Sequence, residues 1–368
     1  MSRVRCNPMR LGAFLFGLLA AGPVLAQPPA ELSVLTYNIE GLPWPARSDR
    51  AEDLSRIADQ LLSLREEGRQ PHVVLFEEAF SADAKAVAVK AGYRYIVDGP
   101  GASDAGTPAR SPADRAFMAA ARFLSGEKFG KWRGSGLRIA SDYPILDVKR
   151  MTYPTCAGTD CLANKGLVLV TIAVPGAPQP VAIVATHLNS RRASGVSTER
   201  AYYAYQRQVD ALSDFVRANI APGVPFIVAG DFNAQQERRA YLLQRAAEWR
   251  AEAPVRAALD TCLEAADQCP VDNRDDLAFS LRRGRDWQLF ASGGSESLTL
   301  KSMAALFGHD AEGNMLSDHV GYAATYAIDA SPSLPTENTG SRTRGSAFQP
   351  VALTIRDRFV ARQSGAPR

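Results

Sequence analysis

The sequence predicts a protein of the α/β class. Short apolar runs with the character of buried strands alternate with amphipathic stretches of helical spacing along most of the chain. Several predicted strands end in polar residues of the kinds found in active sites. The 368 residues are 46% hydrophobic and 22% charged, which is typical of a globular protein and excludes a disordered, collagen-like or fibrous chain.

The first 26 residues have the features of an export signal. A basic stretch ends at Arg10, an apolar run follows from Leu11 to Gly22, and small residues precede a cleavage site after Ala26. The apolar run is shorter than the roughly 20 residues that span a bilayer. We therefore predict a signal peptide over residues 1–26 and a secreted or periplasmic mature protein. An uncleaved membrane anchor is the alternative.

The charge balance weakens a nucleic-acid-binding function without excluding it. The chain has 42 basic and 39 acidic residues, a net charge of +3. Removal of the first 26 residues, which contain three of the arginines and no acid, leaves 39 of each. A neutral protein lacks the overall basic charge on which binding to nucleic acid or anionic membranes normally relies, although local patches remain possible.

Four cysteines follow the predicted signal peptide, in two close pairs. An even number in an exported chain indicates disulfides, and the spacing favours Cys156–Cys161 and Cys262–Cys269 among the three possible pairings. Zinc binding is the rival interpretation. Neither pair has the spacing of a zinc ribbon, and no histidine lies close to either pair in the sequence.

The first part of the predicted domain contains two strands and two helices. Residues 32–38 alternate as a strand does, and residues 49–66 carry apolar side chains at helical spacing behind a cap at Ser48 or Asp49. A buried strand over 72–76 and a short helix over 81–91 follow. Residues 98–112 are rich in Gly, Ala, Ser and Pro and predict a loop.

The second part is richer in strands. The long amphipathic helix is predicted over residues 198–219, because apolar side chains recur along one stripe. The predicted strands cover residues 136–140, 166–174, 180–186 and 225–229, and then 286–290 and 319–328 as the last two. The predicted organisation is a signal peptide (1–26), a catalytic domain (27–330) and a polar linker and tail (331–368).

Polar residues stand at the predicted strand ends. They are Asn38, Glu77, Glu78, His187, Asn189, Asp231, Asn233, Asp318 and His319. Carboxylate and amide oxygens are the ligands that Mg²⁺ prefers, and histidine can take a proton from water near neutral pH. Hydrolysis of a phosphodiester requires an activated water and stabilisation of negative charge. Each feature alone is weak, but together they indicate this chemistry.

Seven stretches resemble, in the same order, the motifs of the endonuclease/exonuclease/phosphatase superfamily, which has the deoxyribonuclease I-like fold. They are Leu-Thr-Tyr-Asn (35–38), Val-Leu-Phe-Glu-Glu (74–78), Gly-Leu-Arg-Ile-Ala-Ser (136–141), Ala-Thr-His-Leu (185–188), Gly-Asp-Phe-Asn (230–233), Asp-Trp-Gln-Leu-Phe (286–290) and Leu-Ser-Asp-His (316–319). The resemblance implies a four-layer α/β sandwich, with two packed mixed sheets flanked by helices and the active site at one edge. It also implies a Mg²⁺-dependent phosphodiesterase, with Mn²⁺ as the alternative ion.

The resemblance assigns expected roles to individual residues. Asn38 and Glu78 are the expected metal pair, and Asp318 a further acid on the metal side. His319 is the expected general base and Asp286 the carboxylate that orients it. The remaining catalytic residues are expected to be His187, which binds phosphate or assists the leaving group, and Asp231 and Asn233, which position water and phosphate.

Two positions depart from the family pattern. His72 stands where the family usually has Asp before the second strand, and we expect a surface histidine there. Glu77 stands where the family usually has Gln or Asn. A second histidine, His309, lies in an irregular stretch, and we expect it to lie outside the active site.

The expected substrate is a phospholipid at a membrane surface. Leu-Ala-Asn-Lys-Gly (162–166) and Glu-Ala-Phe (78–80) resemble neutral sphingomyelinases. Lys165 and Asn189 are the expected substrate-binding residues, although Lys165 is equally typical of a solvated lysine at a strand start. Trp44 and the insertion over 291–315 are candidates for a lipid-facing rim, but the insertion lacks adjacent aromatics. No protein partner is implied, and we expect a monomer.

Three other functions remain open on the same fold. A secreted nuclease would use a phosphate-tracking surface of arginines, namely Arg191, Arg192, Arg238, Arg239, Arg282, Arg283 and Arg285. A phosphatase acting on inositol phosphates would differ mainly in its loops. A noncatalytic binding module is the least favoured, because the set of catalytic residue types is complete.

Overall fold

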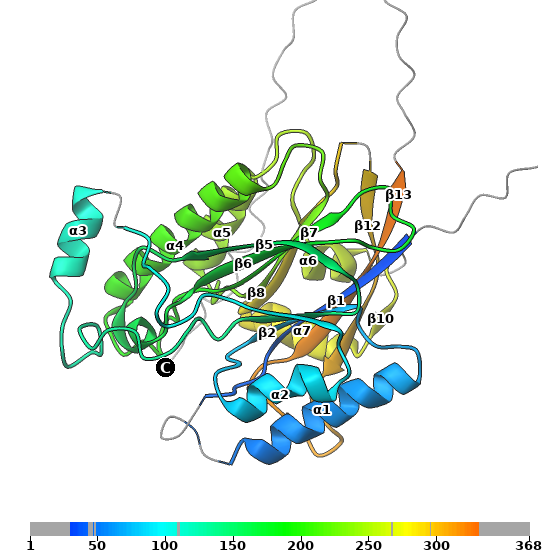
Figure 1. The fold of residues 1–368 in the computed structure, drawn as a ribbon, viewed down its shortest axis with the longest axis horizontal. Helices are drawn as coiled ribbons and strands as arrows, with labels where there is room; N and C mark the ends of the chain where they lie inside the picture. Colours follow the sequence, from blue (N-terminus) through cyan, green and yellow to red (C-terminus); the bar gives the residue numbers. More distant parts are fainter. Residues whose placement is uncertain are drawn as a thin grey trace, which may run out of the picture. The chain divides into compact units, whose positions relative to one another are not determined.

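Two mixed β-sheets pack face to face, and helices cover their outer surfaces (Figure 1). The computed structural model describes residues 30–42, 47, 49–108, 111–265, 268–294 and 296–330, with the backbone alone at Ala330. The predicted signal peptide, Trp44 and the predicted tail (331–368) lie outside the described residues.

The elements follow one another as strands interrupted by helices. The strands are β1 (Ala30–Asn38), β2 (Val73–Glu77), β3 (Tyr95–Asp98), β4 (Arg138–Ser141), β5 (Ile145–Thr152), β6 (Gly166–Ile172), β7 (Val181–His187), β8 (Phe226–Asp231), β9 (Arg256–Ala257), β10 (Val271–Asp272), β11 (Asp286–Ala291), β12 (Glu296–Phe307) and β13 (Gly321–Ala330). The helices are α1 (Ala51–Glu66), α2 (Ala82–Lys90), α3 (Pro112–Ala119), the 3₁₀ turn η1 (Gly158–Leu162), α4 (Thr198–Asn219), α5 (Glu237–Ala246), α6 (Ala258–Glu264) and α7 (Arg274–Arg283).

Each sheet combines parallel and antiparallel pairs. The first has the order β10-β12-β13-β1-β2-β4-β3, and the second β5-β6-β7-β8-β11-β9. The central pairs β1–β2 and β7–β8 are parallel, whereas β1–β13 and β8–β11 are antiparallel. Parallel neighbours end at the same edge, so the carboxyl ends of β1 and β2 lie together in one sheet, as do those of β7 and β8 in the other.

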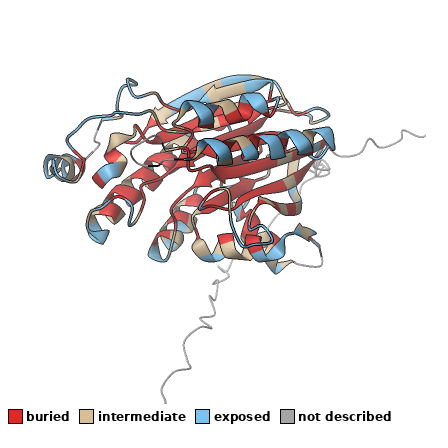
Figure 2. Ribbon diagram, turned by 90° about the horizontal axis from the view of Figure 1, so that it is seen from below, coloured by how far each residue is buried: buried red, intermediate tan, exposed pale blue. Residues whose placement is uncertain are grey.

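The alternation of side chains along each strand creates three apolar layers. Leu32, Val34 and Ile183 belong to the core between the sheets. The opposite face of the first sheet packs on α1 and α2, and that of the second on α4 and α5. Figure 2 shows the buried strands inside and the exposed outer faces of the helices. The four-layer α/β sandwich expected from the sequence is confirmed.

Several predicted elements differ from the structure. Helix α1 starts at Ala51 and lacks a side-chain cap, because Arg50 occupies the N-cap and its guanidinium donates to the carbonyl oxygens of Ile39 and Leu316 at 3.0 and 2.6 Å. Strand β12 lies between the two strands predicted as the last two, so that prediction was wrong. Strands β3 and β5 and helices α3, α5, α6 and α7 were not predicted; they are short, or they lie at sheet edges where the hydrophobic period is weak.

Both predicted disulfides are present. The Cα atoms are 5.2 Å apart in Cys156–Cys161 and also in Cys262–Cys269, which is within the range that a disulfide requires. Among the residues that the structure describes, no helix is long and apolar enough to cross a membrane.

Candidate active site

Strands from both sheets end at one place and bring the predicted catalytic side chains together. His187 and Asp231 are register partners at the ends of β7 and β8, and Asp286 is the register partner of Asp231 at the start of β11. Gly230 permits this close pairing, because a Cβ atom there would lie 1.9 Å from the carbonyl oxygen of Thr186. The side chain of His319 approaches from the loop before β13 in the other sheet.

His319 and Asp286 form a buried hydrogen-bonded pair. The Nδ1 atom of His319 lies 2.8 and 2.9 Å from the two carboxylate oxygens of Asp286, and Nε2 lies 3.7 Å from Asp231. Burial lowers the pKa of His319, but the negative charges of Asp286 and Asp231 outweigh it and raise that pKa to about 9. The contact through Nδ1 orients the ring, and Nε2 then lies 3.1 Å from Nη1 of Arg285 and 3.7 Å from Asp231.

His187 approaches the same carboxylate oxygen of Asp231 as His319 does. Its Nε2 atom is 3.4 Å from Asp231, while its buried Nδ1 atom has no hydrogen-bond partner among the described residues. Burial and the positive charge of Lys165 lower the pKa of His187 to about 4, so the ring is neutral near pH 7. Asp231 stays ionised, because the two histidines outweigh its burial and lower its pKa to about 2.

Asn38 links the two carboxylates nearest to it. Its Nδ2 atom donates to Glu78 and to Asp231, at 3.2 Å in each case, and its Oδ1 atom accepts from the backbone N–H of Glu40. Glu78 directly follows β2 and has φ +57°, a left-handed conformation that is uncommon outside glycine. Burial raises the pKa of Glu78 to about 7. The hydrogen bond from Asn38 and the charges of His319 and Lys165 act in the opposite direction but do not outweigh the burial of Glu78.

The chemistry of these donors fits a divalent cation. Ligand atoms of Asp231, Asp286 and His319 all lie within 4.8 Å of one another. The His319 and Asp286 side chains already contact each other, so the nearest further carboxylate oxygens are those of Glu78 and Asp231. Asn38 presents its Nδ2 atom to these two carboxylates, and its Oδ1 atom faces the backbone N–H of Glu40. Hard oxygen ligands, few in number, are what Mg²⁺ takes when waters complete its shell.

The remaining predicted metal residue has a different environment. Half of the Asp318 side chain is exposed (48%), and its carboxylate pairs with Arg285 at 2.9 Å and Arg283 at 3.7 Å. One oxygen lies 3.6 Å from Nε2 of His319. Within the described part of the chain, no hydrogen bond or ion pair joins Asp318 to Asn38 or Glu78.

The comparisons with known proteins agree with this geometry. The model of the endonuclease/exonuclease/phosphatase family matches residues 35–362. The chain belongs to this family. No curated protein matches the chain in a sequence comparison. Membership of the family supports a hydrolase activity on phosphoester bonds.

Solved structures with low sequence identity share the fold of this family member. The Staphylococcus aureus beta toxin, in a mutant form with bound magnesium ions, has a TM-score of 0.55 at 16% identity and covers 81% of this chain and 99% of its own. Sphingomyelinase C from Streptomyces griseocarneus has a TM-score of 0.52 at 20% identity, covering 81% and 99%. The zebrafish (D. rerio) TDP2, complexed with a single-strand DNA product, has a TM-score of 0.52 at 17% identity, covering 80% and 98%.

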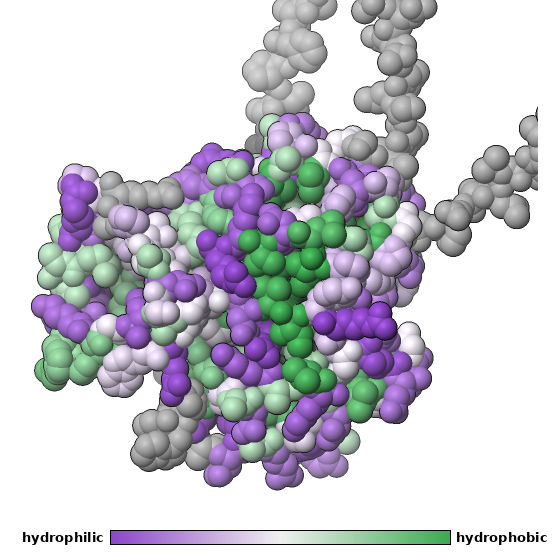
Figure 3. Space-filling view, in the orientation of Figure 1, coloured by the Kyte–Doolittle hydropathy of each residue, from purple (hydrophilic) through white to green (hydrophobic). Residues whose placement is uncertain are grey.

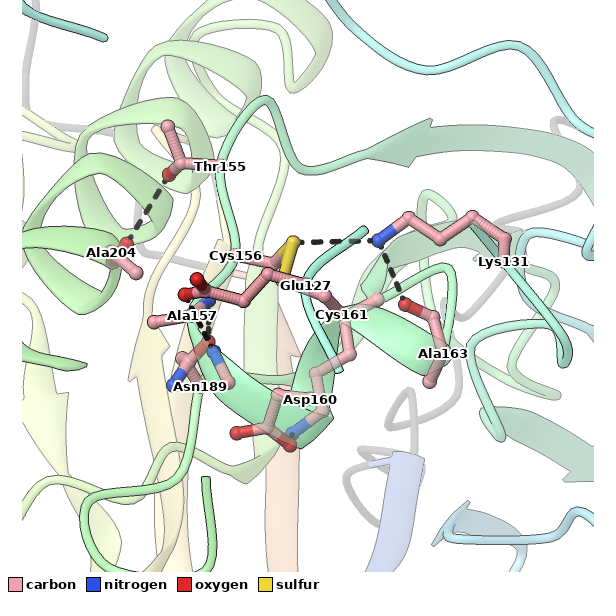
Figure 4. The surroundings of a disulfide bond; sticks show 12 residues. Glu127, Lys131, Thr155, Cys156, Ala157, Asp160, Cys161, Ala163, Asn189 and Ala204 are labelled. Atoms are coloured by element: carbon pink, nitrogen blue, oxygen red, sulfur yellow. Dashed lines mark hydrogen bonds and ion pairs between the residues drawn. A yellow bond between two sulfur atoms is a disulfide. The ribbon is translucent and has the colours of Figure 1, made fainter. Parts of the chain in front are cut away.

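Lys165 and Asn189 are hydrogen-bonded within this family member rather than free. Lys165 is buried, with Nζ 2.7 Å from Asp160 and 3.0 Å from the carbonyl oxygen of Leu188. Asn189 is fully buried, and its Oδ1 atom accepts from the backbone N–H of Ala157 beside the Cys156–Cys161 disulfide, as Figure 4 shows. Both residues connect the disulfide loop to the end of β7, next to His187.

Asn233 contributes to the shape of the site after β8. It has φ +48°, its backbone N–H donates to Asp231 at 3.0 Å, and its side chain donates to the carbonyl oxygen of Leu188 at 3.2 Å. The side chain therefore lies against the end of β7 and ties the two strand ends together.

Arg238 is buried, although it was predicted to lie on the surface among the arginines that track phosphates. That prediction was wrong. Its side chain is fully buried and lies 4.6 Å from the centre of the Tyr205 ring. It donates to the carbonyl oxygens of Asn189 at 2.7 Å, Ser190 at 3.4 Å and Asn233 at 3.5 Å. No sequence signal distinguishes this arginine from its exposed neighbours.

The structure shows the surroundings of the two residues that depart from the family pattern, Glu77 and His72, and of the additional histidine His309. Glu77 is fully buried and accepts a hydrogen bond from Thr36 at 3.3 Å, and burial raises the pKa of its carboxyl group well above the ordinary value. His72 is half-buried rather than a surface residue, because its Nδ1 atom accepts from the backbone N–H of Ser33 at 3.0 Å. His309 pairs with Asp276, outside the catalytic cluster.

Proposed function

We propose that the protein is a secreted, Mg²⁺-dependent phosphodiesterase that hydrolyses a phospholipid headgroup ester, as a sphingomyelinase does. The observation that carries this proposal is the buried His319–Asp286 pair, which faces Asp231 at 3.7 Å. A histidine held by a carboxylate beside further acidic and amide groups is the arrangement that activates water for attack on phosphorus.

In the proposed reaction, His319 accepts the proton of the attacking water at Nε2. Asp286 keeps the ring in the required tautomer through its contact with Nδ1 and stabilises the imidazolium that forms. A Mg²⁺ ion held by Asn38 and Glu78 would supply Lewis-acid stabilisation of the phosphoryl oxygens. The carboxylates of Asp286, Asp231 and Asp318 raise the pKa of His319 to about 9, and a cation bound beside these carboxylates would lower it.

His187 and Asn233 are assigned to the phosphate. His187 is neutral near pH 7 and its Nδ1 atom has no partner among the described residues, so the ring is available to donate a hydrogen bond to a phosphoryl or leaving-group oxygen. Asp231 lies between the two histidines and holds both rings in place. Asn233 and Asp231 share the turn after β8 and position the substrate together.

A phospholipid substrate is favoured over DNA by the arginines. Of the seven arginines of the predicted phosphate-tracking surface, Arg239 pairs with Asp260, Arg283 and Arg285 share Asp318, and Arg238 is buried, so fewer of them are available to bind phosphates. The likeness to beta toxin and sphingomyelinase C supports the lipid proposal, together with the Leu-Ala-Asn-Lys-Gly stretch. The likeness to TDP2 keeps nucleic acid as the second candidate. Two disulfides support an oxidising, extracytoplasmic location.

The proposal is tested by a hydrolysis panel with the mature chain. Sphingomyelin vesicles, phosphatidylcholine vesicles, plasmid DNA and an inositol polyphosphate are each incubated with Mg²⁺ and with a chelator. We expect chelator-sensitive release of phosphocholine from lipid and intact DNA. Cleavage of DNA alone would overturn the lipid assignment, and turnover that survives the chelator would overturn the metal dependence.

Matched variants locate the chemistry in the same assay. We expect His319→Ala and Glu78→Gln to lose nearly all turnover, while His309→Ala, which removes a histidine that also pairs with an aspartate but lies outside the cluster, retains it. Calorimetric titration with Mg²⁺ should show binding to the wild type and to His309→Ala but weaker binding to Glu78→Gln. Full activity of His319→Ala would remove this residue from the reaction.

A further inference from the structure

The loop that follows α3 carries a dense group of exposed apolar side chains. Eight large apolar residues are exposed in the described part of the chain, and four of them lie within ten residues of this loop: Phe123 (58% exposed), Leu124 (98%), Phe129 (41%) and Trp132 (61%). We call these four residues the aromatic loop patch. Figure 3 shows green atoms at the left end of the molecule, at the foot of α3, where this loop lies in Figure 1.

The patch is a preformed surface rather than a set of unrelated side chains. The rings of Phe123 and Phe129 are 4.3 Å apart, and those of Phe129 and Trp132 are 5.5 Å apart. The indole N–H of Trp132 donates to the carbonyl oxygen of Phe129 at 3.2 Å, which leaves the ring faces available. Contiguous exposed apolar surface of this kind indicates an interaction site.

The charges around the patch are of one sign. Five basic residues lie between positions 115 and 133. Arg115, Arg122, Lys128 and Arg133 are exposed, whereas the Nζ atom of Lys131 turns toward the disulfide and lies 3.1 Å from the carbonyl oxygen of Ala163 and 3.6 Å from Sγ of Cys156. The single acidic residue in this stretch, Glu127, is buried and pairs with Arg200 at 2.6 Å. Aromatic rings ringed by lysine and arginine suit the interface of a phospholipid bilayer, where rings enter the headgroup region and cations meet the phosphates.

The loop is held beside the active site. Glu127 accepts from the backbone N–H of Gly158 at 3.0 Å, and the backbone N–H of Trp132 donates to the carbonyl oxygen of Leu162 at 2.8 Å. Gly158 and Leu162 are the first and last residues of η1, which overlaps the Cys156–Cys161 disulfide loop. Asp160 of this loop contacts Lys165 and the backbone N–H of Ser190, three residues after His187. The aromatic loop patch is therefore connected, through the disulfide loop, to the segment that follows His187.

We infer that the aromatic loop patch and its basic rim dock the protein on a phospholipid bilayer whose headgroup phosphates face Arg122 and Lys128. The inference rests on the proposed action on a phospholipid and identifies the surface that brings the site to it. It differs from the two rims considered from the sequence: Trp44 lies outside the described residues, and the single aromatic of the 291–315 insertion, Phe307, is buried.

Vesicle binding tests the inference without turnover. The mature wild-type chain is mixed with phosphatidylcholine vesicles, with and without added phosphatidylglycerol, in the presence of a chelator that prevents hydrolysis. The fraction of protein that sediments with the vesicles measures binding. The Phe123→Ser/Leu124→Asn variant is compared with Val89→Ser/Leu146→Asn, a control that removes two exposed apolar side chains on α2 and β5 (63% and 57%). We expect about tenfold weaker binding or worse for the patch variant and wild-type binding for the control.

Charge reversal separates the two parts of the surface. Arg122→Glu/Lys128→Glu should lose most of the additional binding that phosphatidylglycerol confers and remain folded, because both side chains are exposed. Failure of the wild type to bind either vesicle, or wild-type binding by the patch variant, would overturn the inference. Self-association of the wild type that the patch variant abolishes, with vesicle binding unchanged, would instead make the patch a protein interface and also overturn it.

Activity assays distinguish this inference from the proposed function. On a water-soluble phosphodiester, bis(4-nitrophenyl) phosphate, the patch variant should match the wild type, while its rate on vesicles falls with its binding. Vesicle binding that depends on the patch, with no lipid hydrolysis by any form, would support docking and refute the proposed phospholipid hydrolysis.

Discussion

The imidazole of His319 and the carboxylate of Asp286 come from opposite sheets and meet at 2.8 Å. Asp286 begins β11 in the second sheet, and His319 precedes β13 in the first. The pair therefore forms only when the two sheets are packed against each other. The orientation and the pKa of His319 thus depend on correct packing of the whole sandwich.

Replacement of Asp286 by Asn should impair catalysis while leaving the fold intact. The amide preserves the shape but loses the charge that stabilises the imidazolium, and it permits the wrong tautomer of His319. We expect the turnover number to fall about a hundredfold or more, with a small change in thermal stability. Phosphodiester turnover and circular dichroism measured on one preparation provide the check. A rate within threefold of the wild type would exclude Asp286 from orienting His319.

Arg238 should behave as a positioning residue. Its guanidinium donates to carbonyl oxygens after β7 and after β8, so it holds the strand ends that present His187 and Asp231. Arg238→Met should destabilise the protein by about 2–4 kcal/mol, because buried acceptors lose their donor.

Kinetics separate positioning by Arg238 from a purely structural role. At a temperature where the variant is folded, we expect kcat to fall and KM to change little, with Arg238→Lys recovering part of kcat. Arg239→Met, a change on the same helix that removes the ion pair to Asp260, is the control and should leave kcat unchanged. Equal kcat values for Arg238→Met and the wild type would show that the contacts serve stability alone.

Glu127 should contribute a stability that depends on pH. Burial raises the pKa of Glu127, but hydrogen bonds from Arg200, Gly158 and Arg122 outweigh it and place the pKa below its ordinary value of 4.5. A carboxyl group with a lowered pKa in the folded state stabilises the protein above its unfolded pKa, and this stabilisation is lost as the pH falls through the folded value.

The comparison with Glu127→Gln isolates this contribution. We expect the wild type to have the higher thermal midpoint at pH 6 and above, and the gap between the two proteins to narrow below about pH 4.5 as Glu127 is protonated. Scanning calorimetry over this range measures the gap. A constant gap at all pH values would mean that the charge of Glu127 is irrelevant and that only its shape matters.

The two disulfides should have different consequences when removed. Each closes a short loop, with sequence separations of 5 and 7, and loss of either should cost roughly 2–3 kcal/mol of unfolding free energy. Cys262→Ser/Cys269→Ser should lose stability alone. Cys156→Ser/Cys161→Ser should also lose activity, because its loop carries Asp160, the partner of Lys165. Denaturant titration measures the stability of each double variant, and a turnover assay measures its activity. An equal loss of activity in the two variants would contradict the prediction.

Much of the site was predictable because its chemistry is local to strand ends. Asn38, His187, Asp231 and His319 each stand at or next to the end of a recognisable strand, and parallel strands end at a common edge. The expected pairing of His319 with Asp286 is present, although the two residues are separated by β12, which was not predicted. The edge strands and short helices were not predicted, because their patterns of apolar residues are too short to distinguish these elements from loops.

The sequence by itself determined the α/β class, the family and the set of catalytic residue types, because hydrophobic period and motif order are properties of the chain. Tertiary packing decided which side chains are free. Packing buried Arg238, paired Lys165 with Asp160 and left the aromatic loop patch exposed. These outcomes depend on neighbours from distant segments of the chain. Burial and partner choice are three-dimensional quantities, and they decide whether a residue of suitable chemistry acts on a substrate or supports the fold.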